Sequence, residues 1–408
     1  MNRTDTVTTV HSPRLARGAR SAQRGVTIIE LMVSLVLGLI LMLAALQVFD
    51  ANKTTYRTVE ALARVQENGR FAIQSMARDL RMAGFLGCAS FRQVPVRVIA
   101  NNAPVNPSFA AGTVVQGFNT LGEWGIAAGN ITDAGGNALT VCSDDVAASQ
   151  TCQRSDIIAM VRGSDTSAIT VADMTSNNDV VTLRATSFNN FEGFENNATR
   201  NWGSCGDDPL DADDSPTDCS NDLFIVTDCL RADMFRNTAV AVVGGTQVTL
   251  TPNANLQRNY DENSTVLSVM GATYFVADEA GAGADGIPSL YRMGITREDG
   301  TPPRAVEIAR GVESMQVLYG VDTDNNNAAD LYLNGTAVNG GNLWASVKSV
   351  RVNLVVKSEN DRVTDVSVPW NIVDSDGNNI AINNAGPDRD RRLRMNFTTT
   401  IGLRNRVQ

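Results

Sequence analysis

The sequence predicts an α+β protein in which one long N-terminal α-helix packs on a β-rich C-terminal head. Two observations predict this class. An apolar run near the N-terminus continues directly into a stretch with apolar residues at helical spacing. After Cys88, short β-branched and aromatic segments alternate with loops rich in Asn, Asp and Gly. The helix is therefore predicted to have a transmembrane half and an amphipathic half, and only the second half would contact the head.

Composition and charge restrict the class of function. The chain has 408 residues, 43% of them apolar, and a net charge of −10. Residues 1–25 hold five arginines against one aspartate, so the rest of the chain is the acidic part. Nucleic-acid binding depends on neutralising phosphates, so we expect no nucleic-acid partner. His11 is the only histidine and lies in the basic segment, which argues against catalytic triads and imidazole zinc sites; no enzyme is predicted.

The first element is a membrane-spanning segment, residues 26–46, whose only charged residue is Glu30. As a helix it would be about 32 Å long, enough to cross a hydrocarbon core of about 30 Å. The arginines precede it, so its N-terminus should face the cytoplasm. A secretory signal would have a shorter apolar run, roughly 7–15 residues, and a small residue after it. Here Gly25 precedes the run, so a cut at this glycine would keep the helix.

The second element is the amphipathic continuation of the helix, residues 47–84, on the periplasmic side. Its apolar positions recur every three or four residues, at Leu62, Val65, Gly69, Ala72, Met76 and Leu80. Gly84 and Gly87 are predicted to end it. Residues 85–408 then form the β-rich head, with insertions around residues 100–260. The predicted strands are residues 155–163, 181–188, 223–230, 238–250, 265–278, 289–295 and 349–358.

The stretch Gly25-Val26-Thr27-Ile28-Ile29-Glu30-Leu31 resembles the class III signal of type IV prepilins. In that family a basic leader is cut after its glycine by a prepilin peptidase, the new terminus is N-methylated, and the fifth mature residue is glutamate. The resemblance implies that residues 1–25 are a cleaved leader, that Gly25 and Val26 are the processing residues, and that Glu30 serves assembly. The sequence departs from the pattern in its long leader and its valine at the first mature position.

Three further blocks narrow the resemblance to the PilW-type minor pilins: residues 78–88, 319–324 and 391–406. The resemblance implies a pilin-like fold and a minor pilin that helps to initiate type IV pilus assembly and twitching motility, in a tip complex with other minor pilins and the major pilin. It also implies a single-pass inner-membrane protein that moves to the pilus tip. A minor pseudopilin of type II secretion and a tip-located adhesin are the alternatives. Residues 100–220 resemble nothing that indicates their role.

Glu30 has a physical explanation in this setting. A carboxylate at the centre of a membrane helix costs about 2.5–3.5 kcal/mol on insertion scales and usually has a partner. Cleavage after Gly25 would leave a charged amine on Val26, one helical turn away. In a packed filament, the carboxylate of one subunit can therefore meet the amine of its neighbour.

The cysteines indicate disulfides in an oxidising compartment. There are six, an even number, all after the apolar segment and none in C-x-x-C spacing. Two pairs are close in sequence and bracket polar loops, and the third pair follows by elimination. The predicted pairs are Cys142–Cys152, Cys205–Cys219 and Cys88–Cys229.

One loop has the spacing of a calcium site. Asp322, Asp324, Asn326 and Asp330 take EF-hand positions 1, 3, 5 and 9, and the carbonyl of Ala328 could supply position 7. Asn327 replaces the usual glycine, which is tolerable because asparagine accepts positive φ, and no glutamate follows at position 12. A polar turn without an ion is the other interpretation.

Three more patterns have ordinary interpretations. The aspartates of residues 207–222 favour a solvated loop over a second calcium site, and the glycines of residues 281–286 favour a loop over a nucleotide site. A basic cluster near the C-terminus is expected to pair with nearby aspartates and not with DNA. It consists of Arg389, Arg391, Arg392 and Arg394.

Overall fold

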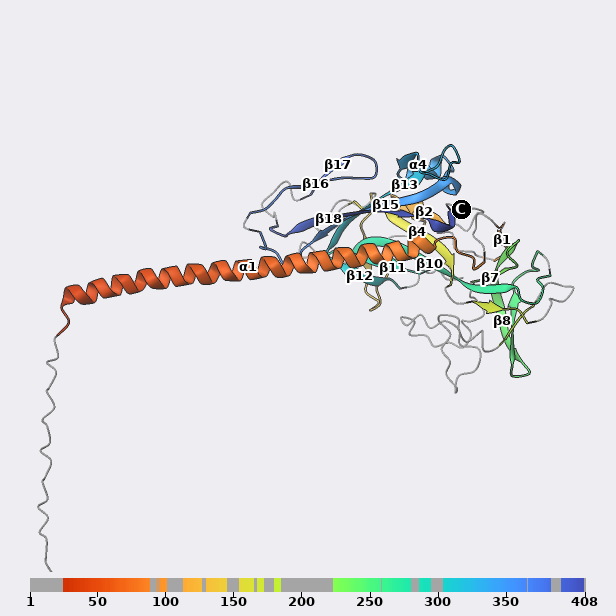
Figure 1. Ribbon diagram of the computed structural model, residues 1–408, viewed down its shortest axis with the longest axis horizontal. Coiled ribbons are helices and arrows are strands. Elements are labelled where there is room, and N and C mark those ends of the chain that lie inside the picture. Colours follow the sequence, from red (N-terminus) through yellow and green to blue (C-terminus); the bar gives the residue numbers. More distant parts are fainter. Residues whose placement is uncertain are drawn as a thin grey trace, which may run out of the picture. The chain divides into compact units, whose positions relative to one another are not determined.

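The structure is a computed structural model, shown in Figure 1. It describes the whole chain except residues 1–24, 89–93, 95, 101–112, 127–129, 145–153, 165–166, 172–179, 185–222, 258, 280–285, 295–303, 365, 383–389 and 407–408. The chain divides into two compact units, residues 1–56 and residues 57–408. Helix α1, Ile28–Met82, begins in the first and ends in the second.

In the first unit, every described residue of α1 is exposed. Thr27 begins the helix: its Oγ1 accepts a hydrogen bond from the backbone N–H of Glu30 at 3.2 Å, as an N-cap does. The residues up to Leu46 are almost entirely apolar on all faces of the helix. A helix that is apolar all round is stable when an apolar medium or other helices surround it.

In the second unit, α1 packs on the head through one stripe of buried residues: Ala61, Val65, Gly69, Ala72, Met76 and Leu80. These positions follow the predicted helical spacing except at the first: Ala61 is buried, whereas Leu62, which was predicted on this face, is 36% exposed. Gly69 lets the helix approach the sheet closely, because a Cβ there would lie 2.3 Å from the ring of Phe397. After Met82 the chain turns through Gly84, whose φ is +77°. Asn405 Nδ2 donates to the terminal carbonyls of Met82 and Ala83 at 3.3 and 3.1 Å.

The larger of the two main sheets in the head contains 12 described strands. Its main path is β12-β11-β10-β7-β8-β9-β6, and β1 to β5 attach to it. β10 is the centre, since it pairs with β3, β4, β5, β7 and β11, all antiparallel. The strands are β1 Val96–Val98, β2 Val115–Phe118, β3 Leu139–Val141, β4 Ile157–Gly163, β5 Ala168–Ile169, β6 Val181–Arg184, β7 Leu223–Thr227, β8 Ala232–Val243, β9 Gln247–Pro252, β10 Thr265–Glu279, β11 Ser289–Met293 and β12 Val306–Arg310.

The second sheet has the strand order β14-β13-β15-β18 and is antiparallel throughout. A separate hairpin, β16–β17, pairs only with itself among the described strands. The strands are β13 Val312–Val321, β14 Leu331–Leu333, β15 Val347–Lys357, β16 Trp370–Val373, β17 Asn379–Ile382 and β18 Arg394–Gly402. The short helices are α2 Leu121–Trp124, α4 Gly335–Gly340, η3 Trp344–Ser346 and η4 Arg404–Arg406.

The main hydrophobic core joins α1 to both sheets. Met76 and Leu80 of the helix belong to one buried cluster with Tyr274 of β10, Val317 of β13 and Val352 of β15. Two smaller clusters lie in the larger sheet, one around Phe224, Phe235 and Leu250, the other around Trp124, Phe275 and Tyr291. The predicted α+β class, with a long N-terminal helix packed on a β-rich head, is confirmed.

Candidate functional site

The N-terminal segment presents an accessible peptide bond just before the helix. Gly25, Val26 and Thr27 precede the first helical residue, Ile28, and all are exposed. A Cβ built on Gly25 would meet nothing within 4 Å, and Val26 is 67% exposed. Exposed, non-helical chain is the form of backbone that peptidases cut most readily. The leader, residues 1–24, lies outside the described residues.

Glu30 occupies the first turn of α1, where the helix dipole favours a negative charge. Its side chain is exposed and forms no ion pair with any residue that the structure describes. Ser34 Oγ donates to the Glu30 carbonyl at 2.7 Å, so this hydroxyl is engaged with the backbone and not with the Glu30 carboxylate. Within the described part of the chain, the carboxylate therefore has no charged partner.

Length and composition make α1 a helix that could cross a membrane. It contains a strongly apolar window with few charges, close to the N-terminus, and none of that window is buried within this chain. The same properties suit contact with the apolar helices of other subunits.

A buried polar contact joins α1 to the larger sheet. Asp79 is 8% exposed, and its Oδ2 accepts hydrogen bonds from Tyr274 Oη at 2.8 Å and Arg292 Nε at 3.0 Å. Ser75 Oγ lies 3.1 Å from the same tyrosine oxygen. Burial, and next the Asp79 carboxylate, raise the pKa of Tyr274, so the phenol stays protonated and donates. This contact fixes how α1 is rotated and shifted on β10 and β11.

A disulfide closes the far end of the same interface. Cys88, just after α1, is bonded to Cys229, in the turn between β7 and β8. This is the pair predicted by elimination. Cys142 is also disulfide-bonded. Its predicted partner Cys152, and the predicted pair Cys205–Cys219, lie outside the described residues.

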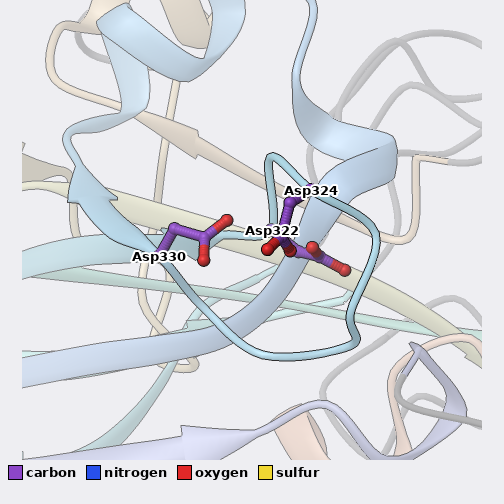
Figure 2. A group of neighbouring side chains, drawn as sticks. All are labelled: Asp322, Asp324 and Asp330. Atoms are coloured by element: carbon purple, nitrogen blue, oxygen red, sulfur yellow. The ribbon is translucent and has the colours of Figure 1, made fainter.

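The loop between β13 and β14 brings the predicted calcium ligands together. Figure 2 shows Asp330 facing Asp322 and Asp324 across the loop, and one oxygen from each lies within 4.8 Å of the others. Asn327 has a φ of +68°, so it makes the turn for which EF-hand loops use glycine. Asp322 is buried, whereas Asp324 and Asp330 are exposed.

The oxygens of this loop already have donors within the chain. Asp322 accepts from the backbone N–H groups of Asn326 at 3.2 Å and Asn327 at 3.0 Å. Lys348 Nζ lies 3.4 Å from Asp322 Oδ2, and both side chains are buried. Burial alone would raise the pKa of Asp322, but the Asn327 N–H and Lys348 lower it below its ordinary value. Lys348 thus supplies the positive charge that a calcium ion would bring, and the calcium site stays a prediction.

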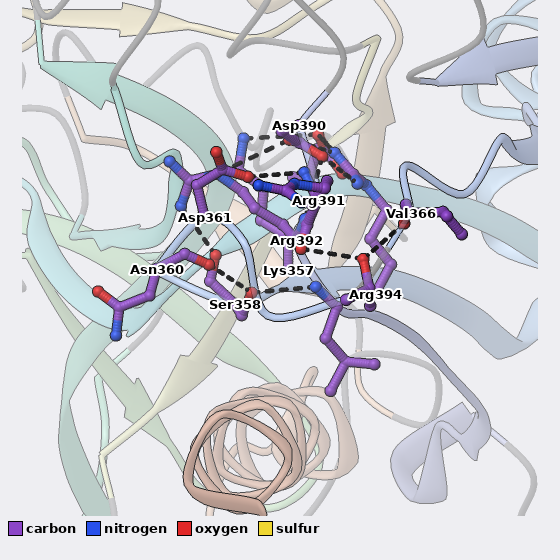
Figure 3. Close-up of polar contacts among 12 residues, drawn as sticks. Lys357, Ser358, Asn360, Asp361, Val366, Asp390, Arg391, Arg392 and Arg394 are labelled. Carbon is purple, nitrogen blue, oxygen red and sulfur yellow. Dashed lines mark hydrogen bonds and ion pairs between the residues drawn. The ribbon is translucent and has the colours of Figure 1, made fainter. Parts of the chain in front are cut away.

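A buried charged cluster links three strands of the second sheet, β13, β15 and β18 (Figure 3). Glu313 accepts from Arg394 Nε at 2.8 Å and lies 3.4 Å from Lys357 Nζ. Arg394 also binds Asp390 through two hydrogen bonds, at 2.7 and 2.8 Å. Burial would raise the pKa of Asp390, but the Arg394 hydrogen bonds lower it. Arg392 and Arg394 of the basic cluster therefore pair with an aspartate, as expected; Arg389 lies outside the described residues.

Two other sequence patterns also lie outside the described residues: the acidic stretch, residues 207–222, and nearly all of the glycine stretch, residues 280–285. Sequence reasoning missed Asp79, although its place on the buried stripe of the helix pattern was a usable signal. It also missed Glu313 and Lys357, because their partners are distant in sequence.

The comparisons with known proteins agree with this geometry. Residues 273–405 match the family described as Type IV Pilus-assembly protein W, a region that includes the second sheet and β11 and β12. Residues 20–46 match the prokaryotic N-terminal methylation motif, which spans Gly25, Val26 and Glu30. No curated protein and no solved structure matches the chain. The C-terminal region of this chain is thus similar to the type IV pilus-assembly protein W family, and its N-terminus matches a prepilin-type methylation motif.

Proposed function

We propose that this protein is a minor pilin that takes part in the initiation of type IV pilus assembly, as a structural subunit of a tip complex with other minor pilins. The observation that carries the proposal is the exposed, apolar N-terminal half of α1, on a chain whose C-terminal region matches a pilus-assembly family. The carboxylate of Glu30, within this apolar segment, forms no ion pair with the described residues. Such a surface requires the inner membrane first and neighbouring helices afterwards. The prepilin-type motif implies processing by a prepilin peptidase, and the major pilin is the next partner in the filament.

Processing comes first. Cleavage between Gly25 and Val26 would remove the basic leader and leave a charged amine at the start of α1. We expect mass spectrometry of the membrane-extracted protein to find N-methylated Val26 as its terminus. Gly25→Ala should keep the leader attached, whereas Gly38→Ala, in the same apolar segment and with open space around its Cβ position, should not impair cleavage. A mature terminus after residue 46 would contradict this assignment.

Assembly follows from the charges that processing creates. Glu30 of one subunit would pair with the Val26 amine of its neighbour, so each desolvated charge gains a partner. Removing one partner of a buried pair costs about 3–5 kcal/mol, because the other charge stays buried without compensation. This cost is large enough to keep a minor pilin, which is present in few copies, out of the filament.

The experiment is a deletion strain complemented with the intact gene, with Glu30→Ala, or with Glu67→Ala as the matched control. Glu67 lies on the exposed face of α1. We expect the deletion to lose most surface pili and twitching motility, and Glu30→Ala to be processed and membrane-inserted but largely absent from sheared pili on immunoblots. Glu67→Ala should restore piliation. Normal piliation of the deletion strain would contradict a role in assembly and would favour an accessory adhesin. Loss of type II secretion with normal pili would favour a pseudopilin.

A further inference from the structure

Strand β18 forms one edge of the second sheet. All nine of its residues pair with β15, and it pairs with no other described strand. It is long for a strand at the end of a sheet, since β14 has three residues, β6 has four and β12 has five. The edge of a sheet presents unpaired backbone N–H and C=O groups, so a long edge can bind a further strand.

The hydrogen bonds at both ends of β18 determine which backbone groups point outward. The carbonyl of Leu393 accepts from the N–H of Ser358 at 2.8 Å, and the N–H of Leu403 donates to the carbonyl of Lys348 at 2.9 Å. Hydrogen-bonded and non-bonded pairs alternate in an antiparallel ladder, so the odd-numbered residues of 393–403 bond to β15. The N–H and C=O groups of the even-numbered residues therefore face the open edge. They are Arg394, Asn396, Thr398, Thr400 and Gly402.

This open edge lacks the usual protection against strand pairing. Natural proteins protect their edges with charged side chains, proline or bulges. Residues 395–402 contain no charged residue and no proline, and their pairing with β15 has no register shift. By contrast, β12 carries Glu307 and Arg310, and β6 carries Arg184. Because threonine, phenylalanine and isoleucine also favour strands, the edge of β18 is well suited to accept one.

The side chains of β18 define the chemistry of a partner strand. Met395 and Phe397 are partly buried and pack against the main core. Thr398 and Thr400, on the opposite face of the strand, are exposed. Thr398 Oγ1 donates to Asn353 Oδ1 at 3.0 Å, so this side chain turns toward β15 and leaves the edge open. A strand added to β18 would place apolar side chains beside Met395 and Phe397, and polar or β-branched ones beside the threonines.

We propose that the open edge of β18 accepts a strand from a different pilin subunit, so that the second sheet continues across the boundary between subunits. This inference rests on the proposed function, which supplies the neighbouring subunit. A second copy of this chain fits the edge less well. Antiparallel pairing of two β18 strands, the more stable arrangement, would relate the copies by a two-fold axis normal to the sheet. Their α1 helices would then run in opposite directions, whereas two prepilin-type helices enter the membrane in the same direction.

Proline at an outward-facing position tests the backbone groups. Thr398→Pro removes an N–H that faces the open edge, whereas Thr399→Pro removes one that bonds to β15. We expect Thr398→Pro to melt near the temperature of the unmodified full chain in detergent micelles, and Thr399→Pro to melt at a lower temperature. Thr398→Pro should nevertheless be at least about tenfold less abundant in sheared pili, because a ladder donor is lost and the ring blocks the partner backbone.

Thr398→Val is the matched control, because it keeps the N–H and should be incorporated like the unmodified chain. Incorporation of Thr398→Pro at the level of Thr398→Val would overturn the proposal.

Photo-cross-linking in piliated cells identifies the occupant of the edge and does not depend on the proline variant. A photo-cross-linking residue replaces either Thr398 or, as a control, Val306, an exposed residue of β12. We expect position 398 to cross-link to one different pilin subunit, at a residue in an extended segment, and position 306 to give no such product. A second copy as the partner, no product at position 398, or equal yields at both positions would each overturn the proposal.

The deletion strain separates this inference from the proposed function. If the deletion abolishes piliation while Thr398→Pro is incorporated normally, the role in assembly stands and the strand pairing is wrong. If the deletion leaves piliation normal, the proposed function is wrong, and cross-linking in the membrane fraction still decides whether a strand pairs with β18.

Discussion

Lys348 and Asp322 show how one buried residue can replace an ion. The β13–β14 loop has three carboxylates near one another and an asparagine in the positive-φ turn position, which favour calcium. The Lys348 ammonium lies 3.4 Å from Asp322 and 3.1 Å from Asn327 Oδ1, in the interior of the same loop. A calcium ion would therefore have to displace a buried ammonium group from Asp322.

We predict that calcium binds weakly to the unmodified chain and more strongly to Lys348→Gln. Bound calcium would stabilise the folded state by about 2.7 kcal/mol at a hundredfold excess over its dissociation constant. Thermal melting with about 1 mM calcium and with chelator measures this, and Asp324→Asn is the matched control that removes one ligand. If calcium changed the melting temperature of neither the unmodified chain nor Lys348→Gln, the loop would be a polar turn without an ion.

The role of a single residue was predictable from the sequence when the residues that define this role lie close to it along the chain. Gly25, Val26 and Glu30 are recognisable because basic leader, glycine, carboxylate and apolar run are contiguous. Asp79 gains its role from Tyr274 and Arg292, 195 and 213 positions away, so the sequence shows a charge on a buried helical face and not its partners. Glu313 likewise pairs with Arg394, 81 positions later.

At the scale of elements, the helix and the strands β4, β6 to β11 and β15 were predictable because their apolar patterns are regular, whereas the other described strands were not predicted. β13 was not among the predicted strands, since its sequence VESMQVLYGV places Glu313, Ser314 and Gln316 in a buried strand. These polar residues are tolerated because each has a hydrogen-bond partner from another part of the chain. The β16–β17 hairpin was also missed, because its strands have only four residues each and Val373 is exposed, so they show no clear alternation.

The close approach of α1 to β18 gives a prediction at this scale. Gly69→Ala would place a methyl group 2.3 Å from the Phe397 ring. Alanine gains about 1 kcal/mol of helix propensity, but overpacking costs about 1–3 kcal/mol, so we expect net destabilisation of up to about 2 kcal/mol. Phe397→Leu should reduce this cost in the double variant, which urea unfolding in a double-mutant cycle would detect.

Gly402→Ala is the matched control, because a Cβ at Gly402 would meet nothing within 4 Å. We expect it to change the free energy of unfolding by less than about 0.5 kcal/mol. If Gly69→Ala proved as harmless as Gly402→Ala, the stalk helix would not be in tight contact with β18.

At the scale of the whole molecule, the Cys88–Cys229 disulfide restrains the unfolded chain. It closes a loop with a sequence separation of 141, which corresponds to about 4–5 kcal/mol in the chain-entropy account. We predict that the Cys88→Ala, Cys229→Ala double variant loses stability of this order in urea unfolding.

The matched control is treatment with a reductant. The reductant should decrease the free energy of unfolding by a larger amount in the unmodified chain than in the double variant. Equal stability of the oxidised unmodified chain and the double variant would mean that the bridge contributes little to the folded state.

The same disulfide also sets a path for mechanical load. A pull applied between the N-terminal helix and the C-terminal strand enters the head near residue 88 and can cross directly to residue 229 through a covalent bond. This covalent path bypasses residues 89–228, so force can pass from the helix to the strands that follow Cys229 without crossing the intervening backbone. A change in loop length between the two cysteines would thus leave the covalent path intact.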